Sequence, residues 1–160
     1  MRIYHGSTVA VRQPSLRYGR ANTDFGKGFY TTTDMEQAAR WALIRKERAK
    51  TGKAIVSVYE IDDAILADSI LNIMQYHGAT EEWLNFVVAN RRGAPLHSFD
   101  IVLGPVANDR LYTTISMFEN GELSVEAAIV QLNTHTLYDQ VAFHTHKALS
   151  LVHFVKTIEV

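Results

Sequence analysis

Histidines are the first candidates for chemistry in this sequence, which contains seven of them. His144 and His146 stand two positions apart, with His135 before them and His153 after them. In a β-strand, residues two apart share a face, so His144 and His146 could bind one zinc ion. No HExxH-type motif or carboxylate-rich segment accompanies them. We therefore interpret these histidines as structural, and we expect no metal site.

The glycine-rich and nucleophile motifs of several common enzyme classes are missing from the sequence. Gly26 and Gly28 give only a GxG, whereas a Walker loop requires GxxxxGK[ST] and a dinucleotide fingerprint requires GxGxxG. Ser7 does not stand in a GxSxG elbow. The chain has no cysteine, which excludes a disulfide framework and a thiol nucleophile. Kinases, classical NTPases, Rossmann dehydrogenases and serine hydrolases are therefore not supported.

Composition indicates one packed domain over residues 1–160. The 160 residues are 47% hydrophobic and 21% charged, as in an ordinary globular protein. Sixteen Lys and Arg against 17 Asp and Glu give a net charge of -1, so no global basic field favours nonspecific nucleic-acid binding. No apolar run approaches the roughly 20 residues that span a bilayer. We expect a cytoplasmic protein without membrane contact.

The elements that must position any site follow from patterning and caps. A Thr33–Glu36 capping box predicts a helix to about residue 49, and Thr80, Asn108 and Ser124 are expected to cap helices that end near residues 90, 119 and 132. Gly121 suits the end of the third helix. Because strands and helices do not alternate strictly, we expect an α+β fold. Strands are predicted at residues 2–5, 25–32, 54–61, 70–76, 100–106, 140–144 and 151–158.

One predicted loop and one side of the first predicted helix have a functional interpretation besides a structural one. Residues 6–24 form a predicted loop longer than the 12 to 15 residues or so that are usual in compact domains, which is typical of lids and binding loops. One side of the first helix is basic, and such a side is either solvated or a phosphate-binding face. The basic residues are Arg40, Arg45, Lys46, Arg48 and Lys50.

Several motifs in order carry a resemblance that covers nearly the whole chain. They are residues 4–7 (YHGS), 24–30 (DFGKGFY), 82–87 (EWLNFV), 100–106 (DIVLGPV) and 139–141 (DQV). The sequence resembles the ADP-ribosyltransferase superfamily, in its diphtheria-toxin and poly-ADP-ribose-polymerase branch. It is most similar there to the bacterial family called domain of unknown function 3990. The resemblance implies a single-domain ADP-ribosyltransferase-like fold, with a mixed or antiparallel split β-sheet core and flanking helices.

The same resemblance implies a site for NAD as co-substrate. His5 would bind a hydroxyl of the adenosine ribose, the Gly6 backbone would pair with the nicotinamide carboxamide, and Tyr30 would stack on the nicotinamide ring. Glycine at positions 6 and 28 would leave room for a flat ligand. The implied catalytic residues are His5, Tyr30 and Gln140, and the implied NAD-binding residues are His5, Gly6, Ser7, Gly28, Tyr30 and Gln140.

Gln140 departs from the superfamily pattern, because it stands where the catalytic Glu would be. Glutamine can bind a ribose hydroxyl but has no negative charge. The implied function is transfer of ADP-ribose from NAD to a cytoplasmic macromolecule, protein or nucleic acid, with a role as a toxin paired with an antitoxin protein. A transferase that uses Asp139 or a carboxylate from another loop, a catalytically weak NAD or ADP-ribose binding module, and an NAD glycohydrolase are the alternatives.

Overall fold

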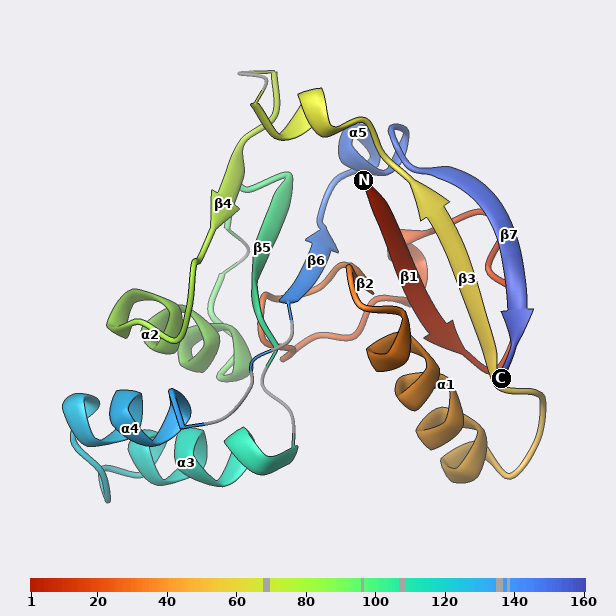
Figure 1. The fold of residues 1–160 in the computed structure, drawn as a ribbon. Helices are drawn as coiled ribbons and strands as arrows, with labels where there is room; N and C mark the ends of the chain where they lie inside the picture. Colours follow the sequence, from red (N-terminus) through yellow and green to blue (C-terminus); the bar gives the residue numbers. More distant parts are fainter. Residues whose placement is uncertain (68–69, 96, 107–108, 135–136, 138) are drawn as a thin grey trace.

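A seven-stranded sheet forms the centre of the computed structural model, which describes residues 1–67, 70–95, 97–106, 109–134, 137 and 139–160 (Figure 1). The strand order is β4-β5-β6-β2-β1-β3-β7, and β4 and β5 run parallel whereas the other paired strands are antiparallel. This mixed sheet with separate helices confirms the α+β expectation. The strands are β1 (Arg2–Ser7), β2 (Phe29–Thr32), β3 (Ile55–Glu60), β4 (Ile73–Gln75), β5 (Ile101–Pro105), β6 (Asp139–Phe143) and β7 (His153–Glu159).

The helices gather beside two different halves of this sheet. In Figure 1, α2, α3 and α4 lie together next to β4, β5 and β6, whereas α1 follows β2 and lies beside β1. The two halves meet at β1 and β2, which share the single registered pair Tyr4–Thr32. The sheet is continuous, and this pair is a narrow junction within it. The helices are α1 (Met35–Ala49), α2 (Glu81–Arg91), α3 (Asp109–Glu119), α4 (Val125–Leu132) and α5 (His146–Leu149), with short 3-10 helices at Leu16–Tyr18 and Asp63–Ala67.

The buried side chains form separate clusters. Trp83 of α2 is fully buried among side chains of α3, α4 and β5, and its ring nitrogen donates a hydrogen bond to the Pro105 carbonyl. A second cluster contains Ile3, Tyr59 and Phe143. Because it combines side chains of β1 and β3 with side chains of β5 and β6, the second cluster spans the junction between the two halves.

Helix α1 contacts β1 more closely than any side chain at position 6 would allow. Ala38 and Ala42, one turn apart, are fully buried on the helix face toward the strand. A Cβ atom at Gly6 would lie 2.0 Å from the Ala38 carbonyl oxygen and 2.8 Å from the Ala42 nitrogen. Gly6 is therefore required by the packing of α1 on β1.

Capping largely follows the sequence, with one correction. The Thr80 and Ser124 side chains accept hydrogen bonds from the nitrogens three residues on, which confirms both predicted caps. The prediction of Thr33 as the cap of the first helix was wrong. Asp34 is the cap, because its carboxylate accepts from the Gln37 nitrogen at 2.9 Å. Asn108 lies outside the described residues.

Several strand predictions extended too far, and two of these differences lie near the predicted site residues. The strand expected from residue 25 begins at Phe29, because Gly26 has a φ of +83° and the preceding residues form a turn. The strand expected to extend to residue 144 is β6, which ends at Phe143, and Thr145 then caps α5. His144 and His146 therefore do not share a strand face. Gly121, with a φ of +77°, follows α3 as expected.

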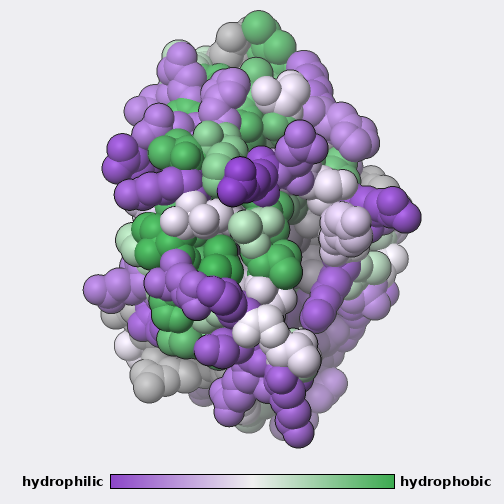
Figure 2. Space-filling view, turned by 90° about the vertical axis from the view of Figure 1, so that its right-hand side faces the viewer, coloured by the Kyte–Doolittle hydropathy of each residue, from purple (hydrophilic) through white to green (hydrophobic). Residues whose placement is uncertain are grey.

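Hydrophobic side chains gather on the side of the molecule that carries the edge strand β7. Figure 2 shows hydrophobic side chains in the middle of this face with hydrophilic ones around them. Val155 of β7 is 42% exposed. No helix within the described residues is long and apolar enough to cross a membrane.

The contact at Gly6 generates the first prediction. Gly6→Ala is expected to lower the free energy of unfolding by about 3 kcal/mol, because the added methyl group collides with helix backbone that cannot rotate away. The matched control is Gly78→Ala, where a Cβ meets nothing within 4 Å and the change should stay within about 0.5 kcal/mol. Urea unfolding measures both, and equal stability of the two variants would contradict the proposed close packing.

Candidate functional site

A cavity of about 1420 Å³ lies where the strands β1 and β2 part. Beyond the Tyr4–Thr32 pair, β1 keeps its pairing with β3 through Ser7, and β2 keeps its pairing with β6 through Phe29. Side chains of β1, β2, β6 and α1 line the space, and the loop of residues 8–28 closes much of its wall. The long loop predicted from the sequence thus borders a cavity large enough for a dinucleotide-sized ligand.

His5 fills the place where the strand ladder is broken. Its Nδ1 lies 2.7 Å from the Tyr30 carbonyl oxygen, and a carbonyl only accepts, so Nδ1 carries the proton. Burial lowers the pKa of His5 to about 4. The hydrogen bond to the Tyr30 carbonyl raises this pKa, but by less than burial lowers it. The ring is therefore neutral at pH 7, and its Nε2 is an unprotonated acceptor. The side chain also stacks on Phe29, with ring centroids 4.7 Å apart.

Tyr30 lines the cavity with its ring and anchors the loop with its hydroxyl group. The hydroxyl donates to the Gly26 carbonyl at 2.6 Å, accepts from the Phe25 nitrogen at 3.0 Å, and lies 2.9 Å from the Thr23 hydroxyl. Burial raises the pKa of this phenol far above its usual value. The hydroxyl is therefore committed to holding residues 23–26 in place.

Gln140 lies on β6 directly across from Thr32 and is 3% exposed. Its Nε2 donates to Asp24 Oδ2 over 3.4 Å, and both residues line the cavity. The other Asp24 oxygen, Oδ1, is 2.8 Å from the Arg91 Nε in an ion pair whose side chains are only 12% and 13% exposed. The sequence-predicted amide thus has a carboxylate beside it. Asp24 belongs to the DFGKGFY motif, which is the signal that could have marked it.

The remaining predicted site residues divide into two groups. Ser7 and Gly28 line the cavity, whereas Gly6 does not and instead contacts α1. The Ser7 hydroxyl accepts from the Val9 nitrogen, and a Cβ at Gly28 would lie 2.8 Å from the Phe143 carbonyl oxygen. Both glycines therefore have packing reasons that the sequence did not distinguish from ligand approach.

Arginines give the cavity a positive lining. Among the described residues on its wall, five are arginines and two are carboxylates, and the carboxylates Asp24 and Glu119 are each ion-paired with an arginine. The pKa of Arg45 is lowered, first by loss of hydration and second by the charge of Arg20. Two guanidinium groups that repel each other would both be stabilised by an anion between them. The arginines are Arg12, Arg20, Arg45, Arg48 and Arg91.

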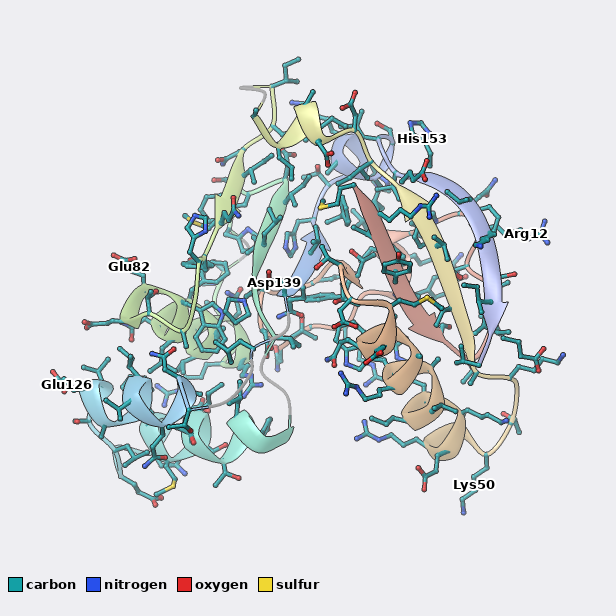
Figure 3. The ribbon with its side chains drawn as sticks, in the orientation of Figure 1. Arg12, Lys50, Glu82, Glu126, Asp139 and His153 are labelled. Carbon is teal, nitrogen blue, oxygen red and sulfur yellow. The ribbon has the colours of Figure 1, made fainter. Side chains whose placement is uncertain are left out.

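Helix α1 presents one stripe of side chains to the cavity. Trp41, Ile44, Arg45 and Arg48 occupy positions i, i+3, i+4 and i+7, and all four line it. The basic side of the helix is therefore only partly a solvent face. Figure 3 shows Lys50 at the far end of the helix, pointing away from the rest of the protein.

The histidines near the chain's end do not form a ligand set. His144 Nδ1 donates to the Lys27 carbonyl at 2.9 Å, while His146 opens α5. No group of three histidines or carboxylates within the described residues could hold a metal ion. His135 lies outside the described residues.

Fold and site together define an α+β protein with a mixed sheet that opens onto an arginine-lined cavity. The chain belongs to the family described as protein of unknown function (DUF3990), whose model matches residues 1–154. That match bears out the nearest family inferred from the sequence motifs. Neither a curated protein nor a solved structure matches the chain significantly.

The Tyr30 hydroxyl generates a stability prediction. Tyr30→Phe should lower the free energy of unfolding by about 1–3 kcal/mol, because the buried Phe25 nitrogen loses its acceptor. Tyr18→Phe is the control, since Tyr18 is 81% exposed and its change should stay within about 0.5 kcal/mol. Chemical denaturation compares the two variants, and an unchanged Tyr30→Phe protein would show that the loop is held by other contacts.

The neutral histidines generate a pH prediction. Burial lowers the pKa of both His5 and His144 to about 4, from an ordinary 6.5. Between these values the unfolded chain binds protons that the folded chain does not, so stability falls as the pH is lowered from 6.5 toward 4. Each histidine contributes a slope of up to about 1.4 kcal/mol per pH unit.

Stability curves at several pH values test this expectation. The free energy of unfolding of His5→Asn, and separately that of His144→Asn, is subtracted from that of the wild type at each pH. Each difference isolates one histidine from the carboxylates that also titrate in this range. Each variant should show a shallower loss of stability over the window. Identical slopes in wild type and both variants would mean that neither imidazole is kept neutral by the fold.

Proposed function

We propose that this protein is an NAD-dependent ADP-ribosyltransferase that transfers ADP-ribose from NAD to a cytoplasmic macromolecule. The observation that carries the proposal is the convergence of His5, Tyr30 and Gln140 on one cavity from the neighbouring strands β1, β2 and β6. Of these three residues, His5 and Gln140 are 135 positions apart in the sequence. The resemblance of their motifs to the ADP-ribosyltransferase superfamily assigns the three residues to one NAD site.

Charge on the cavity wall supports a ligand with a pyrophosphate group. Arg20 of the loop and Arg45 of α1 are close enough for the charge of Arg20 to lower the pKa of Arg45, after the larger effect of burial. Guanidinium groups bind phosphate oxygens through paired N–H donors. A pyrophosphate between them would remove their mutual repulsion.

Ring-lined walls and one acceptor suit the rest of the dinucleotide. The Tyr30 and Trp41 rings offer flat surfaces for nicotinamide and adenine. His5 Nε2, unprotonated because Nδ1 holds the proton, can accept a hydrogen bond from a ribose hydroxyl. The Gln140 amide can bind a second ribose hydroxyl.

The chemistry needs positioning more than an acid or a base. When the bond between nicotinamide and ribose breaks, the electron pair goes to the pyridinium nitrogen and positive charge moves to the ribose. A site that holds NAD bent and places polar groups around that ribose lowers the barrier. Neutral Gln140 is the observation that favours a second candidate, a catalytically weak module that binds NAD or ADP-ribose.

Labelled NAD distinguishes these functions. The purified protein is incubated with adenine-labelled NAD and a cell lysate, and aliquots are then treated with protease or nuclease. A transferase leaves label on macromolecules and one digestion releases it, which identifies the acceptor class. Free ADP-ribose alone indicates an NAD glycohydrolase, and unchanged NAD indicates a binding module.

Thermal unfolding gives the prediction for binding. NAD should raise the melting temperature, and Tyr30→Ala should remove most of that shift because a lost aromatic stack costs about 0.5 to 1.5 kcal/mol beyond its buried area. Tyr30→Phe keeps the ring and should keep the shift even though the protein itself is less stable. Equal NAD-induced shifts in wild type and Tyr30→Ala would place the nucleotide elsewhere.

A further inference from the structure

An oxocarbenium-like ribose needs negative charge nearby, and the predicted position for it holds the neutral Gln140. We propose that Asp24, on the loop before β2, supplies the carboxylate that stabilises the ribose cation. This inference rests on the proposed function and names a catalytic residue for it. Electrostatic stabilisation of charge that develops in the transition state is commonly the largest single contribution to catalysis.

Asp24 is placed for this role by contacts on both of its oxygens. Oδ2 receives the Gln140 amide at 3.4 Å, and Oδ1 receives the Arg91 guanidinium at 2.8 Å. The carboxylate therefore lies between the β6 side chain and α2, on the wall of the cavity. The superfamily resemblance implies a catalytic glutamate at position 140. With Gln140 in that position and Asp24 on the loop, the negative charge lies one hydrogen bond away from it.

Arg91 fixes the carboxylate from the side away from Gln140. Its guanidinium lies over the Tyr112 ring, 4.6 Å from the ring centroid, which orients it independently of Asp24. The Asp24 and Arg91 side chains are 12% and 13% exposed, so both are largely shielded from water. A carboxylate held in a fixed orientation needs little reorganisation when positive charge develops near it.

Other carboxylates near the cavity are less suitable. Glu119 is held by Arg92 at 2.9 Å near the end of α3. Asp139 precedes Gln140 but is exposed and is not among the residues that line the cavity. Figure 3 shows it at the beginning of β6.

The step balances without another reactant besides the acceptor. The C1′–N bond of NAD breaks, its electron pair neutralises the pyridinium nitrogen, and nicotinamide leaves. The cation at C1′ faces the Asp24 carboxylate until an acceptor oxygen or nitrogen forms the new bond. The acceptor's proton then passes to water, and Asp24 is unchanged at the end.

Nicotinamide release and NAD affinity, measured separately, test the role of Asp24. Asp24→Asn has nearly the same shape without the charge, and it should lower kcat by about 10²-fold or more while the Kd for NAD stays within a few-fold. The double variant Asp24→Asn with Gln140→Glu returns a carboxylate to the neighbouring position and should recover at least about tenfold of the lost kcat. Asp139→Asn is the matched control and should behave as wild type.

Each other outcome overturns the proposal. Full activity in Asp24→Asn excludes a catalytic charge at this position, and a loss that Gln140→Glu does not recover makes Asp24 a loop anchor only. NAD binding without cleavage in the wild type overturns the proposed transferase together with the role of Asp24, and it favours the binding module. Absence of both NAD binding and cleavage in the wild type overturns the NAD site as well. Cleavage of NAD by the wild type that is unchanged in Asp24→Asn overturns the role of Asp24 alone.

If Asp24→Asn does not fold, a pair of variants with longer side chains tests the same charge. Asp24→Glu retains the charge and the partner of Arg91, whereas Asp24→Gln has the same length without charge. The Glu variant should exceed the Gln variant in kcat by about 10²-fold, with similar stability in urea. Equal kcat in these two variants would overturn the role of the charge.

Discussion

The hydrogen bond from His5 to the Tyr30 carbonyl is the contact on which the site depends. Two antiparallel strands that separate leave backbone groups without partners, and burying such groups is costly. The His5 ring supplies the donor that the strand ladder would have supplied, at 2.7 Å. The sheet can therefore remain continuous at Tyr4 and Thr32 and open one residue later. Because the ring is neutral, it satisfies the carbonyl without placing a buried charge there.

The loop of residues 8–28 keeps its shape because the sheet binds it at several points. Near its beginning, the Ser57 hydroxyl accepts from the Val11 nitrogen. Near its end, Tyr30 holds Phe25 and Gly26, and His97 is 2.7 Å from the Phe25 carbonyl. A segment without regular strand or long helix is thus fixed by side chains from β2, β3 and the region before β5. This rigidity is what allows Asp24 to stand beside Gln140.

Local charge in the cavity differs from the charge of the whole chain. The chain as a whole has a net charge of -1, which gives no indication of an anion site. Folding brings arginines from the loop, α1 and α2 to one wall, and the carboxylates there are already paired. A wall of this kind suits a phosphate-bearing ligand. The distribution of charge, and not its sum, therefore carries the functional information.

The sequence by itself determined the elements whose signals are local. Periodicity and caps such as Thr80 and Ser124 depend on neighbouring residues only, so the strands and the four longer helices were predicted to within a few positions, whereas the short helix α5 was not predicted. The order of the motifs likewise marked His5, Tyr30 and Gln140 before any distance was known. Local rules failed where two signals competed, as at Thr33 and Asp34, which are both good caps.

Tertiary structure alone decided how these residues act together. Three of the contacts at the site join segments that are far apart in the sequence. They are the contacts of Gly6 with α1, of Asp24 with Gln140 and of Arg45 with Arg20. Such contacts follow from strand order and from the packing of a helix on a sheet, which no spacing along one strand encodes. The fold therefore determined the site's electrostatics, because an interaction between charges depends on their separation in space.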